Sequence, residues 1–105
     1  MQNFSKETSL ARISEMEGRS DRLEQAFQQL AGGLEQVQAG LADFQALKDY
    51  YYSEAWQEDR DFSDRADFPS HLTCGVLSED EIYNILAEAH TQAISMLEIA
   101  LVLLK

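Results

Sequence analysis

The sequence has little cysteine, little proline and few basic residues. Its 105 residues include one cysteine, Cys74, and one proline, Pro69. A single cysteine excludes an internal disulfide and is typical of a reducing compartment, so we expect a cytoplasmic protein. Only 8 basic residues stand against 19 acidic ones, which gives a formal net charge of −11. Because clustered Lys and Arg bind nucleic-acid phosphates and anionic membrane surfaces, we expect neither type of direct binding, and basic proteins or peptides are the favoured partners.

Long hydrophobic runs are also missing. The first residues, MQNFSKETS, contain no apolar segment, so we expect no signal peptide. The longest apolar stretch, residues 93–104, is interrupted by Glu98 and is shorter than the roughly 20 residues that a membrane span needs. The chain is 45% apolar, which is enough for one hydrophobic core, and we expect a single helical domain over residues 1–105.

The first half of the sequence carries a heptad pattern. Apolar residues recur at alternating spacings of three and four, with polar gaps at Ser20 and Lys48. This pattern is typical of a coiled-coil helix and predicts an all-α fold with one long amphipathic N-terminal helix, over about residues 6–53. The residues of this apolar seam are Ile13, Met16, Leu23, Phe27, Leu30, Leu34, Val37, Leu41, Phe44 and Tyr51.

Two glycines, Gly32 and Gly33, leave an alternative open. The heptad phase continues through them, which favours helix, although glycine also suits a hairpin turn. A continuous first helix would be about 70 Å long and a final helix of the predicted length only about 40 Å, so the bare part of the seam should be buried in a homodimer. A turn at Gly32-Gly33 would instead produce a three-helix up-down-up bundle within one chain.

The middle of the chain mixes aromatic and acidic residues without a sustained period. Ser53 is a good cap for a short helix over residues 54–65, and Pro69 and Gly75 indicate a loop in which the chain reverses. We therefore expect the C-terminal helix to pack back antiparallel.

The start of that last helix is marked by the stretch GVLSEDEIYN. Ser78 and Glu81 have the spacing of a capping box, in which the serine hydroxyl accepts from the amide of Glu81 and the glutamate accepts from the amide of Ser78. Leu77 and Ile82 have the spacing of the accompanying hydrophobic staple. The three consecutive carboxylates, residues 79–81, favour the positive end of the helix dipole. These residues therefore predict the beginning of a helix that runs to about Leu104, and not a catalytic site.

With these motifs in view, the chain resembles a family of small bacterial proteins classed as a domain of unknown function. The family pattern is a long amphipathic N-terminal half, a tyrosine pair followed by S-x-x-W-x-x-D, and a G-V-L-S-E-D segment that opens the last helix. The Gly-Gly at positions 32 and 33 departs from this pattern. The resemblance implies a cytoplasmic bacterial protein of helical fold, and no activity. The matching residues are Tyr51, Tyr52, Ser53, Trp56, Asp59, Gly75, Val76, Leu77, Ser78, Glu79 and Asp80.

Acidic and aromatic residues are concentrated between positions 50 and 81. Residues 54–81 contain nine acids and two bases, and six of the ten aromatics lie between residues 50 and 68. Aromatic faces beside carboxylates attract cations, so this region is a candidate surface for a basic peptide or amine. Packing of the aromatics at the end of a helical bundle is the structural alternative. The candidate binding residues are Tyr51, Tyr52, Trp56, Asp59 and Asp80.

Catalytic and metal sites have weaker support in the sequence. His71 and Cys74 have a zinc-chelating spacing but lack a second pair, and His90 is expected to be partly buried. The acidic surroundings of Cys74 disfavour a reactive thiolate. We therefore expect no cofactor, and interpret the protein as a self-associating interaction or scaffolding module. The alternatives are a small enzyme or metal-binding protein centred on residues 51–81, and an acidic mimic that occupies a nucleic-acid-binding partner.

Overall fold

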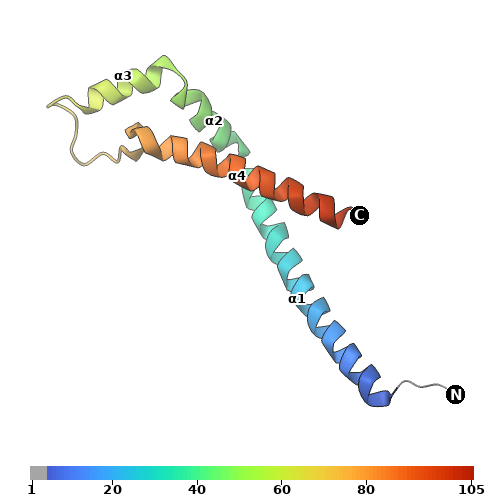
Figure 1. The fold of residues 1–105 in the computed structure, drawn as a ribbon. Coiled ribbons are helices and arrows are strands. Elements are labelled where there is room, and N and C mark those ends of the chain that lie inside the picture. The colour runs from blue at the N-terminus through green and yellow to red at the C-terminus, as the bar shows by residue number, and fades with distance from the viewer. Residues whose placement is uncertain (1–4) are drawn as a thin grey trace. The chain divides into compact units, whose positions relative to one another are not determined.

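The computed structural model describes residues 5–105, which form four α-helices and a short 3-10 helix and contain no strand (Figure 1). The prediction of an all-α fold with a long N-terminal helix is confirmed. The expectation of no signal peptide falls partly on residues 1–4, which lie outside the described residues. The elements are α1 (Lys6–Ala39), α2 (Leu41–Tyr51), α3 (Glu54–Ser63), η1 (Gly75–Leu77) and α4 (Glu79–Leu103).

Helix α1 runs without interruption through Gly32 and Gly33, so the alternative of a turn at these glycines is wrong. Neither glycine has a positive φ, and a Cβ added to either would meet no atom within 4 Å. Glycine permits a turn but does not force one. The continuous heptad phase on either side of the pair is the stronger signal here.

The long helix ends earlier than the heptad pattern predicts. Ala39 is its last residue, and the amide of Gly40 donates to the carbonyl oxygens of Gln36 and Val37, each at 3.0 Å. Helix α2 then begins at Leu41. Glycine costs about 1 kcal/mol in a helix interior and is a common residue at helix ends, which accounts for the break. With 34 residues, α1 is about 50 Å long and not 70 Å.

The chain divides into two compact units near this break, Met1–Leu41 and Ala42–Lys105. The first unit is essentially α1, which is capped by Ser5, whose hydroxyl accepts from the amide of Thr8 at 3.1 Å. None of the residues of α1 is buried. The seam residues on this helix are between 42% and 57% exposed: Ile13, Met16, Leu23, Phe27, Leu30, Leu34 and Val37.

The second unit is organised around the turn between α3 and α4. Figure 1 shows the two helices running in opposite directions on either side of a loop. The described residues contain two buried hydrophobic side chains, Trp56 in the first turn of α3 and Ile82 in the first turn of α4. Helix η1 lies in contact with α3 and with α4. The hydrophobic contacts of this unit are therefore concentrated at one end of α4.

Both predicted helix starts in this unit are confirmed. The hydroxyl of Ser53 accepts from the amide of Trp56 at 3.4 Å, and α3 ends at Ser63, two residues before the predicted end. The hydroxyl of Ser78 accepts from the amide of Glu81 at 3.2 Å. The other half of the capping box is absent, because the amide of Ser78 donates to the carbonyl of Gly75 at 3.0 Å.

The carboxylate of Glu81 lies against Gly75 instead of turning back to Ser78. A Cβ added to Gly75 would lie 2.6 Å from Oε1 of Glu81, so glycine leaves room for this carboxylate. Leu77 is half-buried and Ile82 is fully buried, at the two positions of the predicted staple. The acidic stretch therefore begins a helix, as predicted, with a different contact for its third carboxylate.

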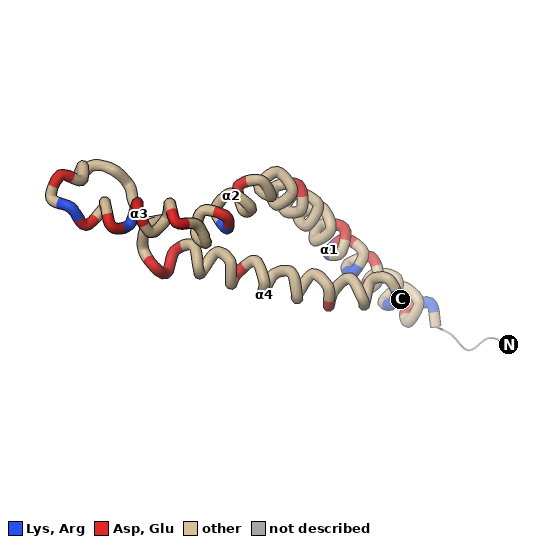
Figure 2. The backbone as a smooth tube through the Cα atoms, turned by 90° about the horizontal axis from the view of Figure 1, so that it is seen from above, with Lys and Arg blue, Asp and Glu red and all other residues tan. Residues whose placement is uncertain are grey.

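Helix α4 is apolar over most of its C-terminal half, where Figure 2 shows few charged residues. Its length and composition would allow it to cross a membrane, although the core helix of a soluble protein also meets these criteria. The expectation of no membrane binding therefore stays a prediction. The large apolar side chains exposed here are Ile94, Met96, Leu97, Ile99, Leu101, Val102, Leu103 and Leu104.

Candidate functional site

Trp56 is fixed by contacts from three parts of the second unit. Its indole Nε1–H donates to the carbonyl oxygen of Val76 at 2.9 Å, which joins α3 to η1. The ring of Tyr51 meets it edge to face, with centroids 5.3 Å apart. The guanidinium of Arg60 lies over the indole, 5.5 Å from its centroid, and donates to Oε1 of Glu79 at 2.7 Å. Trp56 therefore connects α2, α3 and the segment that leads into α4.

These contacts bear on the candidate cation site around Trp56. The cationic partner expected for an aromatic ring beside carboxylates is here supplied by the chain itself, through Arg60. An external cation would have to displace Arg60 from this ring or use another surface. The Arg60–Glu79 ion pair is largely solvent-exposed, with side-chain exposures of 36% and 68%, so water and salt screen it and it contributes little to stability.

The other predicted binding residues do not form one cluster. Tyr51 and Tyr52 are neighbours, with centroids 5.1 Å apart, and Tyr52 is 71% exposed. The carboxylate of Asp59 accepts a hydrogen bond from Tyr50, which is not among the binding residues predicted from the sequence. Asp80 lies exposed in the first turn of α4, and its carboxylate forms no hydrogen bond or ion pair within the described residues.

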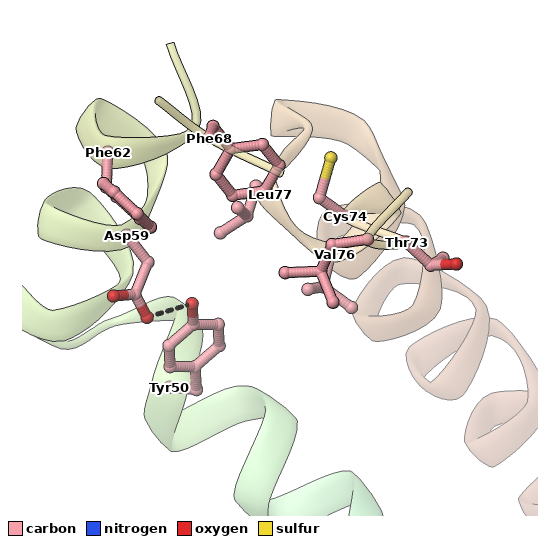
Figure 3. Close-up of a pocket in the computed structure, with 9 residues that line it drawn as sticks. Tyr50, Asp59, Phe62, Phe68, Thr73, Cys74, Val76 and Leu77 are labelled. Atoms are coloured by element: carbon pink, nitrogen blue, oxygen red, sulfur yellow. Dashed lines mark hydrogen bonds between the residues drawn. The ribbon is translucent and has the colours of Figure 1, made fainter. Parts of the chain in front are cut away.

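A cavity of about 310 Å³ lies between α2, α3 and the loop that precedes α4. Figure 3 shows Tyr50 and Asp59 on one side of it and Val76 and Leu77 on the other, with Phe62 and Phe68 close to Asp59 and Leu77. Most of the lining side chains are apolar, and Asp59 is the charged one. The lining residues are Tyr50, Asp59, Phe62, Phe68, Leu72, Thr73, Cys74, Val76 and Leu77.

The polar side of the cavity is a tyrosine–carboxylate pair. The phenol of Tyr50 donates to Oδ2 of Asp59 at 2.7 Å. Partial burial, together with the hydrogen bond to Asp59 and the negative charge of its carboxylate, raises the pKa of Tyr50 to about 12. The phenol therefore stays protonated at neutral pH and keeps donating to Asp59. The second carboxylate oxygen, Oδ1, has no hydrogen-bond partner within residues 5–105.

Negative charge gathers around this part of the second unit, as Figure 2 shows along α3 and at the start of α4. Both bases of residues 54–81 are already engaged, because Arg60 pairs with Glu79 and Arg65 pairs with Asp67 at 3.0 Å. Seven carboxylates of this segment have no cationic partner within the described residues: Glu54, Glu58, Asp59, Asp61, Asp64, Asp80 and Glu81.

Groups that would hold a metal ion are not brought together by the fold. Within residues 5–105, no three His, Cys, Asp or Glu side chains lie close enough to share one. Cys74 is half-buried and lines the cavity, whereas His71 and His90 are exposed and are not among the lining residues.

The binding residues predicted from the sequence do not include several residues that line the cavity, above all Tyr50, Phe62 and Phe68. The signal that could have found them is the concentration of aromatic residues between positions 50 and 68. Periodicity did not select them, because they come from α2, α3 and a loop without a common repeat.

Comparison with known sequences identifies the family. Residues 13–99 match a family described as a domain of unknown function, DUF4298. No curated protein matches the sequence. The match covers most of the chain and extends over both units, from within α1 to within α4. The chain therefore belongs to the DUF4298 family, whose members share a domain of unknown function.

Proposed function

We propose that this protein is a helical interaction module that self-associates as a dimer through the apolar seam of α1. The observation that supports the proposal is the exposure of the seam. Seven large apolar side chains follow one face of a helix about 50 Å long, and none of them is buried. A soluble chain rarely leaves a continuous apolar stripe of this length in water.

The free energy available from this seam is sufficient for association. Each seam side chain is about half exposed, and burying the rest contributes on the order of 1 kcal/mol. Two copies supply seven such side chains each. The total is on the order of 14 kcal/mol. If association costs about 6 kcal/mol, which lies within the roughly 4–15 kcal/mol range, the remaining free energy of about 8 kcal/mol corresponds to dimerisation at micromolar concentration.

Light scattering coupled to gel filtration tests the proposal. The expected mass is twice the 11.9 kDa of the monomer. Replacing Leu30 and Leu34 by Gln should shift the mass to that of the monomer, because both lie in the middle of the seam. The matched control replaces Gln29 and Gln36, which lie off the seam, by Ala. It should leave the mass unchanged.

Two outcomes would contradict the proposal. A wild-type mass of 11.9 kDa at micromolar concentration would mean that the seam is covered within one chain or remains in water. An equal loss of mass in the control variant would mean that the seam is not the contact surface.

A basic protein or peptide is the second candidate partner, at the acidic surface of α3. The supporting observation is the set of seven carboxylates in residues 54–81 without a cationic partner. A cationic partner would be attracted to this surface, most strongly at low ionic strength. The same chemistry would serve an acidic mimic of nucleic acid, whose partner is then a nucleic-acid-binding protein.

A ten-residue oligolysine peptide tests whether a basic partner binds at the acidic surface of α3. Replacing three α3 acids by amides (Glu54→Gln, Glu58→Gln, Asp61→Asn) should weaken binding and reduce its dependence on salt. The matched control removes three charges from α1 (Glu7→Gln, Glu17→Gln, Glu24→Gln). Equal weakening in both variants would show that only the net charge acts, and would overturn a site on α3. Displacement of duplex DNA from a nucleic-acid-binding protein by this protein would favour the mimic.

A further inference from the structure

We propose that the cavity between Tyr50, Asp59 and the loop before α4 is a binding site for a small primary amine that carries an apolar group. The ammonium would donate to Oδ1 of Asp59, and the apolar group would lie against Phe62, Phe68 and Leu77. This site is separate from the α1 seam, so it can be tested independently of self-association.

The size and the walls of the cavity suit a small apolar group. Its volume of about 310 Å³ lies near the lower end of the roughly 300–1,000 Å³ of ligand pockets. Phe62 and Phe68 meet edge to face, with ring centroids 5.4 Å apart. Leu72, Val76 and Leu77 complete the apolar part of the lining. These walls would remove a short hydrocarbon or a single aromatic ring from water.

The polar side of the cavity selects a cation that has N–H donors. Tyr50 donates to Oδ2 of Asp59, which orients the carboxylate and leaves Oδ1 as a free acceptor within the described residues. A primary ammonium carries three N–H donors and can fill this acceptor, whereas a quaternary ammonium cannot. A charge-assisted hydrogen bond of this kind is stronger than a neutral one.

No cation within residues 5–105 pairs with this carboxylate. Arg60 is held by Glu79. Arg65 is held by Asp67 and lies over the ring of Phe62, 5.6 Å from its centroid. Of the three ion pairs within residues 5–105, none includes Asp59. Asp59 is solvent-exposed and lines the cavity without an ion pair to any described side chain, so a ligand ammonium would bind its carboxylate in place of water.

Two-dimensional ¹H–¹⁵N NMR on the full chain tests the proposal, with 2-phenylethylammonium as the probe and 2-phenylethanol as its neutral counterpart. The amine should shift the amide signals of Thr73, Cys74 and Val76, and the alcohol should bind at least about tenfold more weakly, since it lacks the charge. This comparison uses the wild-type chain and does not depend on the folding of any variant.

Asp59→Asn should weaken binding of the amine by about tenfold or more, which corresponds to about 1.4 kcal/mol. Asp61→Asn is the matched control, because it removes the same charge from the same helix at a residue that does not line the cavity. It should change the affinity less than twofold. The fluorescence of Trp56, the only tryptophan, verifies that both variants keep the local fold.

Four results would overturn the proposal: no shift in the lining residues, equal binding of amine and alcohol, equal weakening by the two variants, or tighter binding of Nα-acetyl-lysine methylamide than of the amine. The last result would assign the ammonium to a lysine side chain of a protein partner. A chain that dimerises through α1 but binds no amine would refute this inference alone. A monomer that binds the amine would refute the proposed self-association alone.

Discussion

Ile82→Ala provides a direct test of how the second unit is held together. Ile82 is the one large side chain in the described residues with 0% exposure, and with Trp56 it makes up their buried hydrophobic core. Truncating a buried isoleucine to alanine costs roughly 2–5 kcal/mol, from lost transfer free energy and from the cavity left behind. We expect about 2–3 kcal/mol here, because a small core with exposed neighbours can partly collapse into the space.

Urea denaturation followed by two signals measures this cost. The fluorescence of Trp56 reports the second unit, since it is the only tryptophan and is 9% exposed. Circular dichroism reports total helix content, of which α1 is the longest part. The variant should lower the free energy of unfolding seen by fluorescence, because Ile82 and Trp56 both belong to the second unit.

Ile85→Ala is the matched control. It makes the same substitution on α4 one turn later, at a side chain that is 41% exposed, and should cost less than about 1 kcal/mol. A loss for Ile82→Ala that is no larger than the loss for Ile85→Ala would refute the reasoning. It would mean that the burial of Ile82 does not stabilise the second unit.

Three further predictions follow from local geometry. Replacing Ser78 by Ala should destabilise the second unit by about 1 kcal/mol, as measured by urea denaturation, because the cap of α4 is lost; unchanged stability would contradict this contribution of the cap. The folded-state pKa of Tyr50, about 12, lies above its ordinary value of 10.0, so its contribution to stability is complete below pH 10 and is lost as the pH rises to about 12. Tyr50→Phe should lack this loss in unfolding measurements across that range, and equal pH dependence in both proteins would count against the Tyr50–Asp59 pair. Replacing Gly32 and Gly33 by Ala should raise the stability of α1 by about 1 kcal/mol each, since both lie in a helix with open space around the added methyl group; reduced helix content in circular dichroism would indicate a turn instead.

The contacts within the candidate site could not be predicted from the sequence. The concentration of aromatic and acidic residues between positions 50 and 81 indicated the region in which the cavity lies. Trp56 and Asp59 were expected to act together on a cation, yet Trp56 is covered by Arg60 and Asp59 is bonded to Tyr50. Residues 50 and 59 come from different helices, and their approach depends on the direction in which the chain leaves α2 at Ser53. No periodicity or capping motif encodes that direction.

Features that depend on neighbouring residues could be predicted from the sequence. Ser53 and Ser78 begin helices because a side-chain oxygen and an amide three residues later are within reach whatever the rest of the chain does. The continuous heptad phase likewise favoured a first helix that includes Gly32 and Gly33, as α1 does.

Which residues form the core and the cavity depends on contacts between segments that are distant in the sequence. The indole of Trp56 finds the carbonyl of Val76 twenty residues away, and the carboxylate of Glu81 lies against Gly75 where local rules had paired it with the amide of Ser78. This is because a donor or acceptor group has several hydrogen-bond partners of similar free energy within reach. The choice among them depends on the path of the loop between α3 and α4, which brings the carbonyl of Val76 to the indole of Trp56.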